Sequence, residues 1–154
     1  MHRRPYILLI ILSATLIIAP LTAFLLGGRT MASEAKAAAP RISVVSTKVT
    51  PSPISTLDVL TIGTTLKNNA QRVDDLYVEL KVRAEDGQEV LHAAQRGVGI
   101  DGGENQSVYW VWRIPGRLGS GDYTVQIGVY GPDRTTLYAM DETAGGFHVD
   151  AKTY

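Results

Sequence analysis

Hydrophobic and polar residues alternate with a period of two over much of the chain after residue 40, which is the pattern of half-buried β-strands. The alternation is clearest in residues 106–115 and 121–130, and both tryptophans of the chain fall on one face of the first stretch. That face is predicted to lie at the centre of a hydrophobic core. The inward side chains of the two stretches are Val108, Trp110, Trp112, Ile114, Tyr123, Val125, Ile127 and Val129.

Shorter alternating stretches, separated by turn residues, predict further strands. They span residues 42–49, 56–67, 75–83, 88–93, 136–140 and 146–150. Residues 96–104 contain four glycines and are predicted to form a loop, as are residues 144–146 between the last two strands. No segment after residue 40 keeps a helical period over about 11 residues. About seven strands, with turns about every 8–12 residues, predict an all-β fold, an immunoglobulin-like antiparallel β-sandwich.

The segment Leu118–Tyr123 has the local pattern of a tyrosine corner. Glycines at positions 119 and 121 suit a tight corner, and Tyr123 stands at the start of the following strand. In immunoglobulin-like domains a tyrosine at this place donates its hydroxyl hydrogen to the backbone a few residues upstream. We therefore expect the Tyr123 hydroxyl to bind the corner, although a tyrosine that only packs in the core would fit the same sequence.

An N-terminal hydrophobic helix is predicted before this domain, because residues 6–28 carry no charge and follow Arg3 and Arg4. A run of about 20 apolar residues can cross a membrane, and the two arginines favour a cytoplasmic N-terminus. The run is longer than the apolar region of a usual signal peptide, which favours a retained signal anchor. Small residues before Pro40 also fit a signal peptide that is cleaved near residues 37–39.

Both alternatives place the rest of the chain outside the cytoplasm. It would be periplasmic or at the cell surface, anchored to the inner or cytoplasmic membrane by residues 6–28, or it would be secreted after cleavage. The predicted organisation is therefore a signal anchor or signal peptide at residues 1–29, a linker at residues 30–40, and an immunoglobulin-like domain at residues 41–154.

Composition and charge exclude several classes of function. Residues 40–154 carry 11 basic and 14 acidic residues, a net charge of −3, and this balance gives no basic surface for nucleic acid. The chain has no cysteine, which excludes thiol nucleophiles and cysteine metal sites. His92 and His148 lie on different predicted strands without the spacing of metal ligands. With no phosphate loop or dinucleotide motif either, we predict no catalytic, cofactor-binding or metal-ligating residues.

Five segments follow one another in an order that resembles a known family: residues 50–54, 60–69, 109–115, 121–130 and 136–139. The series is similar to the immunoglobulin-like (fibronectin-III-like) accessory modules attached to bacterial glycoside hydrolases and other secreted bacterial proteins, and it covers residues 42–150. The resemblance implies a non-catalytic module that serves as a spacer, a stabilising partner of a catalytic domain, or an adhesive unit. The shared motifs are packing motifs, so they bear on fold more than on function.

Tyrosines on the outward faces of the predicted strands are the remaining candidates for ligand binding. The alternation puts Tyr77, Tyr109 and Tyr130 outward. In an immunoglobulin-like strand order Tyr77 and Tyr130 share one sheet, and Tyr109 lies on the other. Because sugar rings can stack on exposed aromatic faces, Tyr77 and Tyr130 are the candidate stacking residues for a carbohydrate.

Two hypotheses of function follow. The first is a non-catalytic, membrane-tethered or exported module with a structural or protein-binding role in the cell envelope, whose partner is an envelope or secreted protein. The alternative is a carbohydrate-binding accessory module that assists a glycoside hydrolase and binds a polysaccharide. An uncleaved N-terminal helix would contact the membrane, and we expect neither a nucleic-acid partner nor enzymatic activity.

Overall fold

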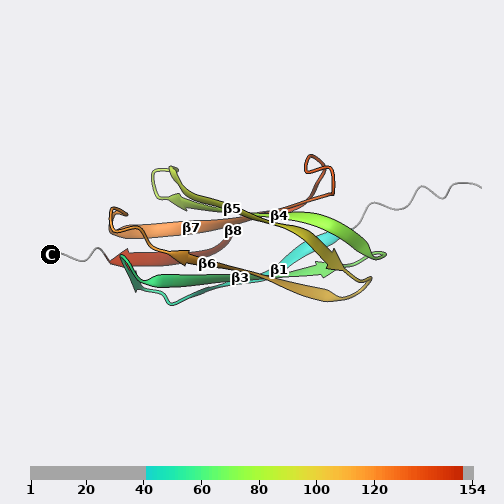
Figure 1. The fold of residues 1–154 in the computed structure, drawn as a ribbon, viewed down its shortest axis with the longest axis horizontal. Coiled ribbons are helices and arrows are strands. Elements are labelled where there is room, and N and C mark those ends of the chain that lie inside the picture. Colours follow the sequence, from blue (N-terminus) through green and yellow to red (C-terminus); the bar gives the residue numbers. More distant parts are fainter. Residues whose placement is uncertain (1–40, 151–154) are drawn as a thin grey trace, which may run out of the picture. The chain divides into compact units, whose positions relative to one another are not determined.

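The computed structural model describes residues 41–150, which form two β-sheets that pack face to face as two layers (Figure 1). The strands are β1 (Ile42–Thr50), β2 (Ile54–Ser55), β3 (Val59–Asn68), β4 (Val73–Ala84), β5 (Glu89–Ile100), β6 (Asn105–Arg113), β7 (Gly121–Tyr130) and β8 (Leu137–Asp150). Within this range no residue is helical, so the described part of the chain is all-β. The predicted hydrophobic segment at residues 6–28 and the linker lie outside the described residues.

The two sheets have the orders β1-β3-β6 and β2-β8-β7-β4-β5. All neighbouring strands are antiparallel except β2, which runs parallel to β8. Pro51 and Pro53, which cannot donate to a ladder, separate β1 from β2. From Ile42 the chain therefore runs first in the three-stranded sheet and crosses to the edge of the five-stranded sheet before β3 begins. No helix that could span a membrane occurs among residues 41–150.

The loop predicted over residues 96–104 is right only for residues 101–104, and the loop predicted at residues 144–146 is wrong; both errors have the same cause. Residues 96–100 belong to β5, which stays paired with β4 as far as Ile100. Residues 137–150 form one strand, β8, where two strands separated by a loop were predicted. Its pairing with β7 jumps from Asp141 to Gly145, so the intervening residues bulge out while the strand continues. Glycines inside a strand often mark such bulges, and here they were mistaken for loops.

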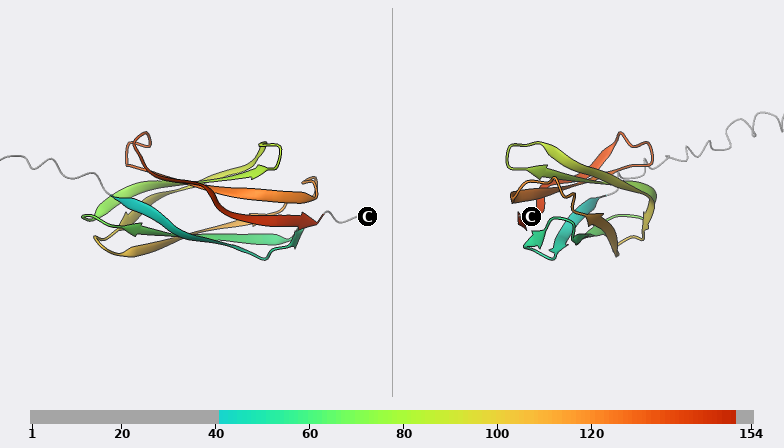
Figure 2. Two further views of the ribbon diagram at one scale, coloured as in Figure 1. Left: turned by 180° about the vertical axis from the view of Figure 1, so that it is seen from behind. Right: turned by 60° about the vertical axis from the view of Figure 1, so that its left-hand side comes forward.

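Figure 2 shows the two sheets as facing layers, and the side chains on their inward faces form the core. Of the predicted central residues, Val125 and Ile127 are fully buried, and Trp110 keeps only 7% of its surface exposed. Trp112 is only partly buried, because it lies at the margin of the core with its ring edge-on to Phe147 at a centroid distance of 6.3 Å. The three-stranded sheet therefore contributes one central and one marginal tryptophan.

The tyrosine corner has the geometry that the sequence predicts. The Tyr123 hydroxyl donates to the carbonyl oxygen of Gly119 at 2.8 Å, and the buried ring stacks on Phe147 at a centroid distance of 5.4 Å. Burial raises the pKa of the Tyr123 hydroxyl, and the nearby Asp86 carboxylate raises it further. The hydroxyl therefore stays protonated and serves as a donor that closes the corner before β7.

Candidate functional site

The structure brings two of the three outward tyrosines together. Tyr77 of β4 and Tyr130 of β7 are direct cross-strand partners on the outer face of the five-stranded sheet. Their ring centroids are 6.1 Å apart, with the ring planes inclined by 59°. Tyr109 lies on β6 in the other sheet and is 60% exposed. The two candidate stacking residues are therefore neighbours, and their role in binding stays a prediction.

Two arginines lie over the ring of Tyr77. The guanidinium carbons of Arg96 and Arg134 are each 5.9 Å from the ring centroid, within the range of a cation–π contact. Arg96 comes from β5, and Arg134 comes from the loop between β7 and β8. Neither arginine is predicted from the sequence, because Arg96 falls in a predicted loop and Arg134 has no periodic neighbours.

A β-bulge places Arg96 opposite Tyr77. In the β4–β5 ladder Leu76 pairs with Val98 and Val78 pairs with Gln95, so Tyr77 alone faces two residues of β5. These two residues are Arg96 and Gly97. The φ of Gly97 is 70°, a left-handed conformation that glycine adopts without a steric penalty. A bulge of this kind redirects the neighbouring side chain, which here is the side chain of Arg96.

A hydrogen-bonded loop places Arg134. The loop is drawn in orange and red between β7 and β8, and it projects beyond the five-stranded sheet (Figure 2). The Asp133 carboxylate accepts hydrogen bonds from the amides of Thr135 and Thr136, at 3.0 and 2.9 Å, and from the Thr136 hydroxyl at 2.5 Å. These bonds hold the pKa of Asp133 well below its usual value. Arg134 itself has a φ of 59°, which is the left-handed conformation of a turn and not that of an extended strand.

A buried carboxylate on the same face fixes Tyr130. Glu79 faces outward from β4 but is only 9% exposed. It accepts a hydrogen bond from the Tyr130 hydroxyl at 3.3 Å and lies 3.0 Å from Lys81 Nζ and 2.7 Å from His92 Nε2. Burial opposes ionisation of Glu79, yet the bonds from Lys81 and His92 bring its pKa below the usual value. Glu79 is thus an ionised carboxylate that orients the Tyr130 ring.

We call Tyr77, Tyr130, Arg96 and Arg134, together with the underlying Glu79, the Tyr77 surface. It presents aromatic rings and two planar guanidinium groups, which suit binding of a ligand by contact with rings and by hydrogen bonds. In residues 41–150, no group of three or more histidine and acidic side chains could hold a metal ion.

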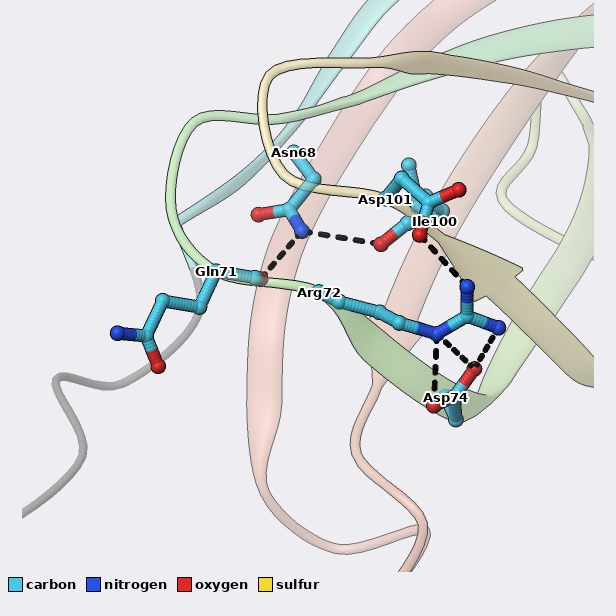
Figure 3. Close-up of polar contacts among 6 residues, drawn as sticks. All are labelled: Asn68, Gln71, Arg72, Asp74, Ile100 and Asp101. Atoms are coloured by element: carbon cyan, nitrogen blue, oxygen red, sulfur yellow. Dashed lines mark hydrogen bonds and ion pairs between the residues drawn. The ribbon is translucent and has the colours of Figure 1, made fainter.

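The β4–β5 pair is fixed beyond the bulge by a buried asparagine (Figure 3). Asn68, at the end of β3, is fully buried, and its Nδ2 donates to the carbonyl oxygens of Gln71 at 2.6 Å and Ile100 at 3.1 Å. One buried amide therefore ties the loop before β4 to the last residue of β5, which limits how far the two strands can move at the bulge.

An arginine beside this asparagine shows how the fold uses a structural guanidinium. Arg72 lies between two carboxylates, 2.9 Å from Asp74 and 2.6 Å from Asp101 (Figure 3). Its hydrogen bond lowers the pKa of Asp74, and the two carboxylates raise the pKa of Arg72. The charge of Arg72 is thus matched within the fold, unlike that of the arginines over Tyr77.

Two other polar sites lie outside the Tyr77 surface. The imidazole Nδ1 of His148 is 2.7 Å from Asp122, which raises the pKa of the histidine. A hollow of about 440 Å³ lies between the β4–β5 turn and the β6–β7 loop, lined in part by Glu89, Arg117 and Tyr123. Tyr123 uses its hydroxyl there for the corner, and the hollow lies apart from the Tyr77 surface.

Comparison with known proteins shows the fold and no closer relationship. No family model and no curated protein matches the chain. Among solved structures, the C-terminal domain of wzt superimposes with a TM-score of 0.62 at 13% identity, covering 73% of this chain and 75% of that one. A β-glucuronidase from glycoside hydrolase family 2 gives 0.53 at 16% identity, covering 66% of this chain and 12% of the enzyme chain. The CARDB domain of the PF1109 protein from Pyrococcus furiosus, in complex with di-metal ions, gives 0.50 at 15% identity, covering 71% and 93%.

These likenesses identify the described residues as an immunoglobulin-like β-sandwich domain. They do not single out the fibronectin-III type that the sequence motifs favour. Since the chain spans only 12% of the β-glucuronidase, the likeness there is to one domain of a larger enzyme.

Proposed function

We propose that this chain is a non-catalytic accessory module that acts outside the cytoplasm and binds a carbohydrate through the Tyr77 surface. The observation that carries the proposal is the pairing of Tyr77 with Tyr130 on one sheet face, under two guanidinium groups. Aromatic rings bind the apolar faces of sugars, and guanidinium groups donate hydrogen bonds to their oxygens. The surface is also built in advance, since a bulge, a closed loop and Glu79 fix its side chains, which lowers the entropic cost of binding.

Retention on insoluble polysaccharides tests the proposal. The full chain, purified in a non-ionic detergent, is expected to bind a polysaccharide, and Tyr77→Ala is expected to abolish retention. Tyr109→Ala is the matched control, because it removes an exposed tyrosine from the other sheet. Unchanged unfolding temperatures of both variants show that the fold is intact. Retention that survives Tyr77→Ala, or is lost in Tyr109→Ala, contradicts the assignment of the site.

A structural or protein-binding role is the second candidate, and a specific observation favours it. The outer face of the three-stranded sheet exposes Val59, Tyr109 and Val111, the last at 73%. Exposed apolar residues that lie together often mark protein contacts. In a pull-down from membranes, Val111→Glu should then lose an envelope protein that Tyr77→Ala retains. Loss of that protein from the Tyr77 variant alone would move the contact to the five-stranded sheet.

Export rests on residues 6–28 and is tested separately. A signal anchor predicts a full-length chain that sediments with membranes and resists carbonate extraction. A cleaved signal peptide predicts a soluble chain that begins near residues 38–40. The intact mass of the native protein distinguishes the two, and a full-length chain in the cytosolic fraction would contradict both.

A further inference from the structure

We infer that the Tyr77 surface selects an acidic carbohydrate, whose carboxylate groups bind the guanidinium groups of Arg96 and Arg134. The inference rests on the proposed carbohydrate function and names the class of its ligand. It begins from the position of the two arginines: each guanidinium carbon is 5.9 Å from the centroid of Tyr77. A neutral sugar would have to compete with them for the faces of that ring, so the ring alone is not an open stacking platform.

Neither guanidinium has a matching anion in the fold. Among the hydrogen bonds and ion pairs of residues 41–150, none is donated by the side chain of Arg96 or Arg134. Both residues are exposed. Two carboxylates of this part of the fold are already bound: Glu79 by Lys81, His92 and Tyr130, and Asp133 by its own loop. The two positive charges therefore face solvent with their donors free.

The backbone around both arginines is irregular in a way that favours a ligand role. Arg134 adopts a φ of 59°, a conformation that glycine or asparagine adopts more readily than arginine. Arg96 is aimed at Tyr77 by a bulge that depends on the left-handed Gly97. Bulges and strained residues gather where a side chain must be positioned for binding. Two independent irregularities converge on one ring, although a plain sheet surface requires neither.

The geometry favours a carboxylate ligand. A guanidinium presents a planar fork of N–H groups that matches a carboxylate in a bidentate pair. Since both guanidinium carbons are 5.9 Å from the same centroid, they are at most about 12 Å apart. Carboxylates on one sugar or on neighbouring sugars of a chain can therefore reach both arginines, while Tyr130 remains available for ring contact.

A pair of polysaccharides that differ only in the carboxylate tests the inference. The full chain in non-ionic detergent is titrated with polygalacturonate and with its fully methyl-esterified form, and polyglutamate serves as a non-sugar anion. We expect binding to polygalacturonate that weakens as salt increases, and binding at least about tenfold weaker to the ester and to polyglutamate.

Variants of the two arginines complete the test. Arg96→Gln and Arg134→Asn are each expected to weaken polygalacturonate binding roughly tenfold to a hundredfold, as loss of a charged hydrogen bond does. Asparagine is chosen at position 134 because it tolerates a positive φ. Arg83→Gln is the control for net charge, since Arg83 lies on the same outer face of β4, about 20 Å along the strand. Unfolding temperatures show that each variant is folded.

The outcomes separate this inference from the proposed function. Equal binding of the acid and the ester, or full affinity in both arginine variants, overturns the acidic ligand and leaves a carbohydrate site if Tyr77→Ala still abolishes binding. Equal binding of polyglutamate overturns the carbohydrate part. A lack of binding to every polysaccharide overturns both proposals.

Discussion

Each of the two sheets has a tyrosine that covers a glycine on its outer face, and the two tyrosines are held very differently. Tyr109 covers Gly63 on the neighbouring strand, where an added methyl group would come within 2.7 Å of the ring. Tyr130 covers Gly128 on its own strand, where the corresponding distance is 2.9 Å. Tyr109 is mostly exposed, whereas Tyr130 is half-buried and its hydroxyl is bound to Glu79.

The two outer faces differ in whether their side chains are held by contacts with one another. On the five-stranded sheet the outward side chains bind one another, and Glu79 is almost as buried as a core residue. On the three-stranded sheet Val59 and Val111 face outward into solvent. Pre-organised side chains lose less entropy on binding, so we expect the five-stranded sheet to be the better ligand surface although both sheets carry tyrosines.

The largest effect is expected where the inner and outer faces of one strand are compared. On β6, Trp110→Ala should cost about 3–5 kcal/mol of unfolding free energy, as truncation of a buried aromatic residue does. Its neighbour Val111 points outward, and Val111→Ala should change the stability by no more than about 0.5 kcal/mol. Urea denaturation measures both. A larger loss for Val111→Ala than for Trp110→Ala would mean that the register of β6 is inverted.

The next effect compares the outer faces themselves. Glu79→Ala leaves Lys81 and the Tyr130 hydroxyl without their shared partner and should cost about 1–3 kcal/mol. Thr61→Ala is the control, because Thr61 faces outward from the middle of the three-stranded sheet and is exposed. It should lie within about 0.5 kcal/mol of the wild type in the same denaturation experiment. Equal losses would remove the distinction between the two faces.

The stabilising effect of Glu79 should depend on pH with a defined sign. Its pKa in the folded protein lies below the ordinary value of 4.5, so its charged contacts stabilise the fold above that value. The stabilisation is lost as the pH falls through the lower, folded pKa. The difference in unfolding free energy between wild type and Glu79→Gln should therefore be constant above about pH 5.5 and shrink below about pH 4.5. A difference that grows on acidification would contradict the assignment.

The sequence was sufficient for the elements whose signal is local. Alternation identified the inward faces of β6 and β7, and the glycine-rich corner before Tyr123 predicted the bond of its hydroxyl to Gly119. It also placed Tyr77 and Tyr130 on outward faces. Their direct pairing depends on the register of β4 against β7, which is a property of the sheet as a whole.

The remainder of the Tyr77 surface depends on irregular backbone. A glycine in a strand and a glycine in a loop look alike in sequence, so the four glycines of residues 96–104 predict a loop where β5 continues to Ile100. Arg96 was lost with it. Arg134 is placed by bonds from Asp133, which no hydrophobic period reveals. Glu79 is charged and faces outward, so alternation does not predict its burial, which comes from the neighbouring side chains.

A smaller effect is expected from removing the hydroxyl of a tyrosine, and it should depend on whether the tyrosine is buried or exposed. Tyr123→Phe should cost about 1–2 kcal/mol, because the Gly119 carbonyl loses its donor in a buried corner. Tyr109→Phe removes a hydroxyl from an exposed ring and should be neutral within about 0.5 kcal/mol. Thermal unfolding at fixed pH compares them. A neutral Tyr123→Phe would reduce the corner to packing alone.

The smallest and most selective effect should come from the glycines beneath the two tyrosines. Neither Gly63 nor Gly128 has a positive φ, so alanine fits the backbone at both positions and removes some entropy from the unfolded chain. At Gly63 the added methyl group only has to push aside the exposed ring of Tyr109, so Gly63→Ala should stay within about 0.5 kcal/mol of wild type. At Gly128 it meets Tyr130, which is held by Glu79, and also Met140, so Gly128→Ala should lose about 1 kcal/mol. Adding Tyr130→Ala to Gly128→Ala should relieve that loss, while adding Tyr109→Ala should not. Chemical denaturation of the single glycine and tyrosine variants and of the two paired variants measures the coupling. An equal cost at both glycines would show that the two tyrosines are equally free to move, and the contrast between the two outer faces would then be lost.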